Sequence, residues 1–99
     1  MEKSSPHYGL AKVTAFLAAG QIRTTKSARE GAIELGLEFA DIKNVIAGLT
    51  IRNFYKSMTT LADHTIWQDV YHAETSDRRR IYLKLTIIDD ILVISFKER

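Results

Sequence analysis

The side chains of this sequence that could do chemistry gather in its second half, in two predicted strands at 54–60 and 66–72. These strands read FYKSMTT and IWQDVYH, and they carry aromatic rings, an ammonium, an amide and hydroxyls in place of aliphatic filler. Two further predicted strands, 81–88 and 91–97, add Tyr82, Lys84 and Lys97. Groups of these types stabilise anions, hold hydroxyls and transfer protons.

The register of the last two strands decides which of these side chains share a face. If Asp89-Asp90 is a two-residue turn, Tyr82 lies opposite Lys97 and Lys84 lies opposite Ser95. The same register pairs Leu83 with Phe96, Leu85 with Ile94 and Ile87 with Leu92 on a core face. On the outer face it also pairs Thr86 with Val93. A slip of one residue would bury the phenol and the ammonium, so we expect this register to be well determined.

The first hairpin adds to the same surface. Joining Thr60 to Ile66 puts Lys56 opposite Val70 and Gln68 opposite Met58, so that Lys56 and Gln68 share one face. The other face would carry Tyr55, Ser57, Trp67, Asp69 and Tyr71, and the pattern leaves open which of the two faces is buried. A face bearing Lys56, Gln68, Tyr82, Lys84 and Lys97 would be open and cationic, and the run Arg78-Arg79-Arg80 would extend it.

Such a face could cleave RNA without a metal. The reaction needs a base for the 2′-hydroxyl, an acid for the leaving 5′-oxygen and cations for the charged phosphorane. The lysines could stabilise charge and Tyr82 could exchange a proton, whereas Gln68 could only orient a hydroxyl. Aromatic side chains such as Tyr55 hold single-stranded RNA by stacking. The plainer interpretation is that tyrosine and lysine on an exposed strand are ordinary surface residues.

The chain has three histidines, His7, His64 and His72, whose spacing fits no zinc motif, so we expect neither a metal site nor a cofactor. His64 lies between Asp63 and Thr65 at a predicted loop tip and is a candidate acid or base near neutral pH. Alternatively, Asp63 and His64 cap and tighten the turn.

The elements that would position these residues are three helices followed by the strands. Ser5-Pro6 is typical of a helix start, and Gly20 of its end. A second helix is predicted over Lys26–Leu35, capped by Thr25, and a third from Phe39 to Gly48. Between the first two helices, residues 21–24 could be extended. This order predicts one α+β domain over residues 1–99, with helices packed on one face of an antiparallel sheet.

Composition narrows the class of protein. The chain has no cysteine, a net charge of +2 and a pI of ≈ 9.0, which excludes disulfides and weakly favours an anionic partner. The N-terminus lacks the apolar region of a secretory signal, and no apolar run could span a bilayer, so we expect a cytoplasmic protein without membrane contact. Residues 24–46 vaguely resemble a helix-turn-helix, but Glu38 and Asp41 would approach DNA phosphates poorly.

Seven segments together resemble the MqsR toxin family, the motility quorum-sensing regulators of bacterial type II toxin–antitoxin systems. They are PH at 6–7, GQIRTT at 20–25, ELGLEF at 34–39, NVIAGL at 44–49, FYKSMTT at 54–60, DHTIWQDVY at 63–71 and YLKLT at 82–86. The resemblance implies a RelE-like fold and an mRNA interferase that cleaves at GC-containing triplets, in the setting of translating ribosomes.

By the same resemblance, Lys56, Gln68 and Tyr82 are the catalytic candidates, and Lys97 is the lysine of the family's FKE ending. Tyr55, Lys84, Lys97 and Arg80 are our candidates for RNA binding. The implied partner is an MqsA-type antitoxin, which would carry the zinc and the helix-turn-helix and through which any DNA contact would be indirect. Asp89 stands where one member of the family has a histidine, so a histidine role there does not carry over. The alternative is a regulatory co-repressor without catalysis.

Overall fold

The computed structural model describes residues 1–99 and has three helices and a six-stranded sheet in the strand order β1-β3-β4-β5-β6-β2. The elements in chain order are β1 (Glu2–Lys3), α1 (Leu10–Ala18), β2 (Ile22–Thr24), α2 (Lys26–Glu34), α3 (Phe39–Ala47), a 3₁₀ turn η1 (Ile51–Asn53), β3 (Phe54–Thr59), β4 (Trp67–Glu74), β5 (Arg80–Ile88) and β6 (Asp90–Glu98). The predicted α+β class is confirmed. The sheet is antiparallel except at its edge, where β2 runs parallel to β6.

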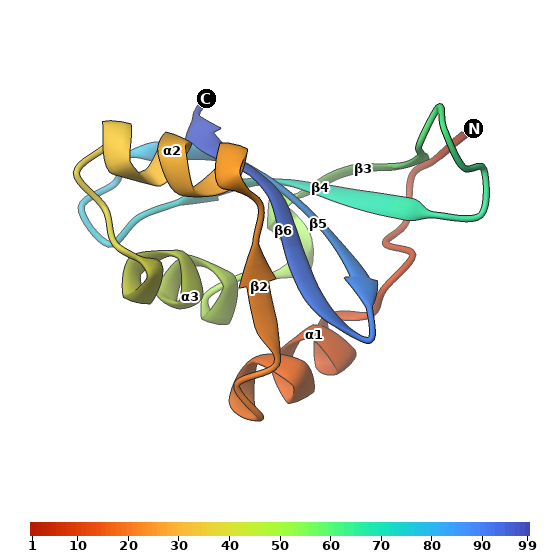
Figure 1. Ribbon diagram of the computed structural model, residues 1–99, viewed down its shortest axis with the longest axis horizontal. Coiled ribbons are helices and arrows are strands. Elements are labelled where there is room, and N and C mark those ends of the chain that lie inside the picture. The colour runs from red at the N-terminus through yellow and green to blue at the C-terminus, as the bar shows by residue number, and fades with distance from the viewer.

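The helices cover one face of the sheet and leave the other face open (Figure 1). In Figure 1, α1 and α3 lie below the strands and α2 lies along β6. The core forms between these helices and the covered face, and its largest members are Tyr71, Phe96, Ile42, Ile81, Leu83 and Leu85. Side chains on the opposite face of β3 to β6 therefore have no helix above them.

The second and third helices begin and end as their sequences predict. The Thr25 hydroxyl accepts from the Ala28 amide at 3.1 Å, which caps α2. Gly36 follows α2 with φ +72°, a left-handed conformation that glycine adopts without strain. α3 ends with Gly48 as its C-cap.

The predicted start of the first helix at Ser5-Pro6 is wrong. α1 begins at Leu10, with Gly9 as its N-cap. The preceding amides are not helical because His7 N and Tyr8 N donate to the carboxylate of Asp69, at 3.1 and 2.9 Å. This buried carboxylate on β4 fixes the segment between β1 and α1 against the sheet.

The register of β5 with β6 is confirmed in one half and wrong in the other. Tyr82 pairs with Lys97 and Lys84 with Ser95, as predicted. Beyond them a bulge leaves Ile94 without a partner, so the next pairs are Leu85 with Val93, Thr86 with Leu92, Ile87 with Ile91 and Ile88 with Asp90. Asp89 then forms the tip of the hairpin alone, with φ +66°. The turn is one residue shorter than predicted, and the bulge at Ile94 compensates by leaving one residue of β6 unpaired.

Thr86 also departs from the predicted alternation. It was predicted to lie outward with Tyr82 and Lys84, yet it is buried. Its hydroxyl donates to the Trp67 carbonyl at 2.7 Å and lies 3.2 Å from the Tyr8 hydroxyl. These contacts tie the far end of β5 to β4 and to the N-terminal segment.

Candidate active site on the open face of the sheet

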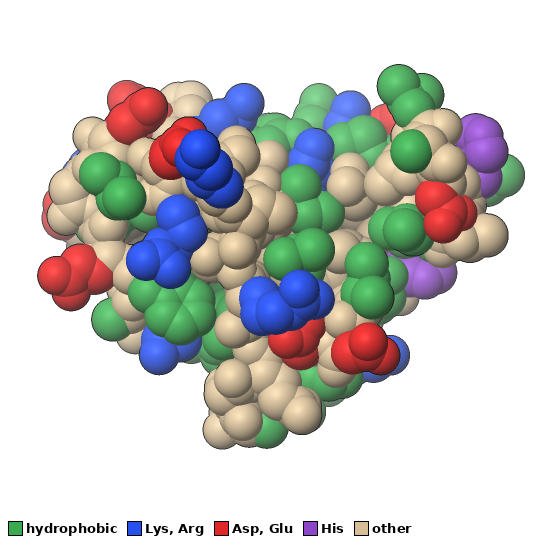
Figure 2. All heavy atoms as spheres, in the orientation of Figure 1, with side chains coloured by type: hydrophobic (Ala, Val, Ile, Leu, Met, Phe, Trp, Pro, Cys, Tyr) green, Lys and Arg blue, Asp and Glu red, His purple; other side chains and the backbone are tan.

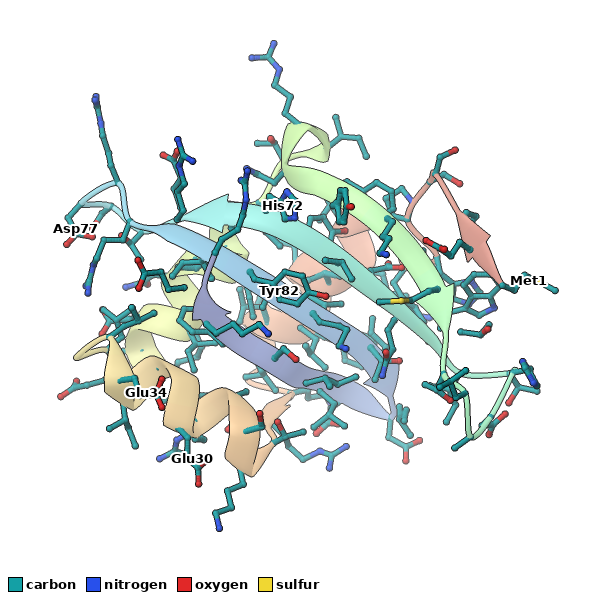
Figure 3. The ribbon with its side chains drawn as sticks, turned by 90° about the horizontal axis from the view of Figure 1, so that it is seen from above. Met1, Glu30, Glu34, His72, Asp77 and Tyr82 are labelled. Atoms are coloured by element: carbon teal, nitrogen blue, oxygen red, sulfur yellow. The ribbon has the colours of Figure 1, made fainter.

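Adjacent strands bring the predicted catalytic residues onto the open face. Lys56 on β3 pairs with Val70 on β4, and Val70 pairs in turn with Lys84 on β5. Gln68 lies two residues before Val70 on β4, and therefore on the same face. Tyr82 lies two residues before Lys84, and Figure 3 shows it on the side of the sheet away from the helices.

Lys97 completes this surface from β6. It is paired with Tyr82, and its ammonium lies 5.2 Å from the centre of the Tyr82 ring. The sequence therefore placed Lys56, Gln68, Tyr82, Lys84 and Lys97 correctly on one face. We call this set, together with Tyr55 and His72 described below, the open-face cluster.

Positive charge is concentrated at the open-face cluster. Burial lowers the pKa of Lys84, and repulsion from Lys97 and Lys56 lowers that pKa further. The one carboxylate paired with these lysines is that of Glu2, 3.4 Å from the Lys56 ammonium. Figure 2 shows lysine and arginine side chains along the upper side of the molecule, above the strands. An ammonium group repelled by two others favours an anion nearby.

A second bulge adds Tyr55 to the cluster. Phe54 pairs with Tyr71 and Lys56 with Val70, so Tyr55 is the extra residue of β3. Our predicted placement of Tyr55 on the other face, with Ser57 and Asp69, is therefore wrong. Its ring stacks on His72, with centroids 4.3 Å apart and planes inclined by 20°. The Tyr55 side chain is 52% exposed, so its ring is accessible to a stacking base.

His72 is a member of the cluster that the sequence analysis missed as a site residue. It pairs with Tyr82 across β4 and β5, and the two rings lie 6.3 Å apart (Figure 3). The signal was present in the alternation of β4, because His72 follows Gln68 and Val70 on the same face.

His64 lies away from the cluster. It is exposed in the loop between β3 and β4, beyond Trp67. Trp67 and His72 are five residues apart on β4, which is about 17 Å at roughly 3.3 Å per residue. The turn itself is tightened by Asp63, whose carboxylate accepts from the amide and the hydroxyl of Thr65 at 2.8 and 2.5 Å. These two bonds lower the pKa of Asp63.

The three arginines do not act as one patch. Arg79 donates to the Leu35 carbonyl at the end of α2 (2.5 Å) and pairs with Asp77. Arg80 begins β5, is exposed, and lies two residues from Tyr82. Arg80 therefore extends the open face, whereas Arg79 supports the fold.

No group of three or more histidine, aspartate or glutamate residues is placed to hold a metal ion. None of the helices is both long and apolar enough to cross a bilayer. What the open face offers is ammonium groups, two phenols, an amide and an imidazole.

Comparisons with known proteins agree with this arrangement. The family model described as motility quorum-sensing regulator, toxin of MqsA, matches residues 5–98. The mRNA interferase toxin MqsR of Escherichia coli (strain K12) is 54% identical over 99 residues, which is 100% of this chain and 100% of that protein. A toxin of a toxin–antitoxin system has an antitoxin as its partner. The chain belongs to the family of motility quorum-sensing regulator toxins.

Proposed function

We propose that this toxin is an mRNA interferase, an endoribonuclease that arrests translation and growth by cutting messages on the open face of its sheet. The observation that carries the proposal is the presence of Lys56, Lys84 and Lys97 together with Tyr82 on a face that no helix covers. The E. coli relative, named as an mRNA interferase, supports the same activity. Residues 1–99 would act as one toxin domain in the cytoplasm, where messages are translated.

The reaction is an attack of the 2′-hydroxyl oxygen on the adjacent phosphorus. The new bond to phosphorus forms as the bond to the 5′-oxygen breaks, leaving a 2′,3′-cyclic phosphate and a 5′-hydroxyl. Lys56, Lys84 and Lys97 stabilise the charge that develops on the phosphoryl oxygens. Tyr82 donates its phenolic proton to the leaving 5′-oxygen, and Gln68 holds a ribose or base group by its amide.

Nucleobases would be held beside the reacting phosphate by stacking. Tyr55 offers one ring face, because His72 occupies the other. Arg80 extends the phosphate contacts along β5. The preference for GC-containing triplets and the dependence on translating ribosomes remain part of this proposal and follow from the family resemblance.

The antitoxin in this proposal is an MqsA-type protein that carries its own zinc and a helix-turn-helix. The toxin would then contact DNA only through that partner. Within this chain, α3 buries Ile42, Val45 and Ile46 against the core, so most of its apolar face is committed to packing. A co-repressor role without catalysis is the competing function that the experiment must exclude.

The test is primer-extension mapping of cellular mRNA after a short pulse of expression, with wild type beside Tyr82→Phe. We expect new 5′ ends at one short sequence in the wild type, reduced by about 100-fold in the variant because a proton donor is lost. Tyr8→Phe is the matched control, because it removes a phenolic hydroxyl bonded to Thr86 outside the cluster.

Two results would contradict the proposal. Equal cleavage by a folded Tyr82→Phe protein would remove Tyr82 from the reaction. An absence of new 5′ ends in the wild type, with growth unaffected, would favour the co-repressor.

A further inference from the structure

The His72 ring lies beside Tyr82 on the open face and is the one imidazole of the cluster. It is stacked on Tyr55 at 4.3 Å and lies 6.3 Å from the Tyr82 ring, with an inclination of 46°. The backbone carbonyl of His72 accepts from the side-chain amide of Asn53 at 3.2 Å, which ties this part of β4 to η1. Neither ring nitrogen has a hydrogen-bond partner in the protein, so both are available to a substrate.

The surroundings of His72 keep its imidazole neutral. The titratable and charged groups around it are Tyr55 from β3, Tyr82 from β5 and Arg99 at the chain end. No carboxylate forms an ion pair with it. Burial lowers the pKa of His72, and the charge of Arg99 lowers that pKa further. At neutral pH the ring is therefore a proton acceptor, whereas tyrosine and lysine side chains ordinarily keep their protons.

The other two histidines cannot serve the cluster. His7 stacks on Trp67 at 5.2 Å and its Nδ1 accepts from the Lys3 ammonium at 2.8 Å, at the opposite end of β4. His64 lies in the loop beyond that same end. His72, by contrast, lies beside Tyr82 on the open face.

We propose that His72 accepts the proton of the attacking 2′-hydroxyl, a role that rests on the proposed RNA cleavage and adds its missing base. The proton passes from the 2′-oxygen to a ring nitrogen of His72 as that oxygen bonds to phosphorus. Tyr82 protonates the 5′-oxygen on the other side. The centres of the two rings lie 6.3 Å apart on neighbouring strands, so both groups reach the same part of the open face. The histidinium and tyrosinate exchange protons with water before the next turnover.

His72→Phe is the decisive variant, because phenylalanine retains a ring to stack on Tyr55 but cannot accept a proton. His64→Gln is the matched control from the same hairpin. Each protein is given a ribosome-bound mRNA that carries the mapped cleavage sequence, and single-turnover rates are measured from about pH 5 to about pH 9, so that the range extends below the ordinary pKa of histidine. Affinity is measured separately with the same RNA bearing a 2′-deoxyribose at the cleavage position, and folding by thermal melting.

We expect His72→Phe to slow cleavage by about 100-fold while binding the deoxy substrate as the wild type does. The wild-type rate should fall as pH decreases through the lowered pKa of His72, and this decrease should be absent in the variant. His72→Gln should behave as His72→Phe does, and His64→Gln should match the wild type.

Three outcomes would overturn the inference. A folded His72→Phe protein with the wild-type rate and pH profile would show that another group, such as Lys84, is the base. Weaker binding with an unchanged maximal rate would limit His72 to supporting the Tyr55 ring. Failure of the wild type to cleave would instead remove the proposed function itself, which the primer-extension experiment detects independently.

Discussion

The buried carboxylate of Asp69 should contribute strongly to the stability of this fold. It is fully buried on β4 and accepts three hydrogen bonds, from the Ser57 hydroxyl at 2.6 Å, the Tyr8 amide at 2.9 Å and the His7 amide at 3.1 Å. Asp69→Ala removes all three acceptor contacts at once. The donors then remain without partners unless the N-terminal segment leaves the sheet.

The size of the loss follows from the burial of each donor. A buried donor without a partner costs about 1–3 kcal/mol, and Ser57 is fully buried. The His7 and Tyr8 amides are only partly buried, so water can reach them and each costs less. We therefore expect Asp69→Ala to lower the free energy of unfolding by about 3–4 kcal/mol, a large part of the roughly 5–15 kcal/mol of an ordinary domain.

Trp67, the one tryptophan of the chain, reports on the same segment. His7 stacks on its ring with an inclination of 11°, and the Lys3 ammonium lies 4.1 Å from the ring centre. Urea unfolding should give the loss of stability. Before unfolding, tryptophan emission of Asp69→Ala should shift to the red and become more accessible to acrylamide.

Two further variants test whether the carboxylate of Asp69 holds the N-terminal segment. Asp69→Asn retains one acceptor oxygen, so its stability should lie between those of the wild type and Asp69→Ala. Asp63→Ala is the matched control, because Asp63 also accepts from an amide and a hydroxyl but lies in the turn between β3 and β4. If Asp69→Ala unfolded at the wild-type urea concentration with unchanged emission, the carboxylate would not hold the N-terminal segment.

Two predictions concern other positions. A Cβ at Gly31 would lie 1.9 Å from the Phe96 carbonyl oxygen, so Gly31→Ala should lower the free energy of unfolding by about 3 kcal/mol or more. A Cβ at Gly9 would meet nothing within 4 Å, so Gly9→Ala is the control and should cause no such loss in urea unfolding. Arg80→Ser should reduce the salt dependence of RNA binding, and Arg79→Ser should instead lower the melting temperature because it loses the carbonyl at the end of α2. An unchanged salt slope for Arg80→Ser, or an unchanged melting temperature for Arg79→Ser, would reverse these assignments.

Local signals made the helices and most of the sheet predictable. Thr25 precedes the first residue of α2 and Gly36 follows its C-terminal end, and both ends were predictable because capping depends on residues within one turn. The start of α1 was not predictable in this way. The amides of His7 and Tyr8, which precede the helix, donate to Asp69, 62 and 61 residues further along the chain. Ser5-Pro6 therefore gave a plausible but incorrect start. Arg79 is similar, since its acceptor, Leu35, is 44 residues away.

The bulges had no comparable signal in the sequence. Alternation assigns each residue of a strand to one face, and one extra residue reverses the faces of everything on one side of it. Ile94 and Ser95 are both half-buried, so neither side chain forbids the shift. The sequence therefore predicted the core residues Leu83 and Leu85 of β5 correctly. On β6 the prediction was wrong beyond the bulge, because Val93 and Ile91 are buried there in place of Ile94 and Leu92.

These bulges also explain how a sheet with one covered face acquires a reactive one. Without the bulge in β3, Tyr55 would enter the core with Ser57, and His72 would have no ring to stack on. The bulge in β6 lies between Val93 and Ser95, so Lys97 keeps its pairing with Tyr82 while the core pairs shift. The open-face cluster therefore depends on irregular backbone on both sides of β4 and β5. Deleting Tyr55 would remove the bulge and keep Phe54 on the covered face beside Tyr71, while His72 would lose the ring on which it stacks.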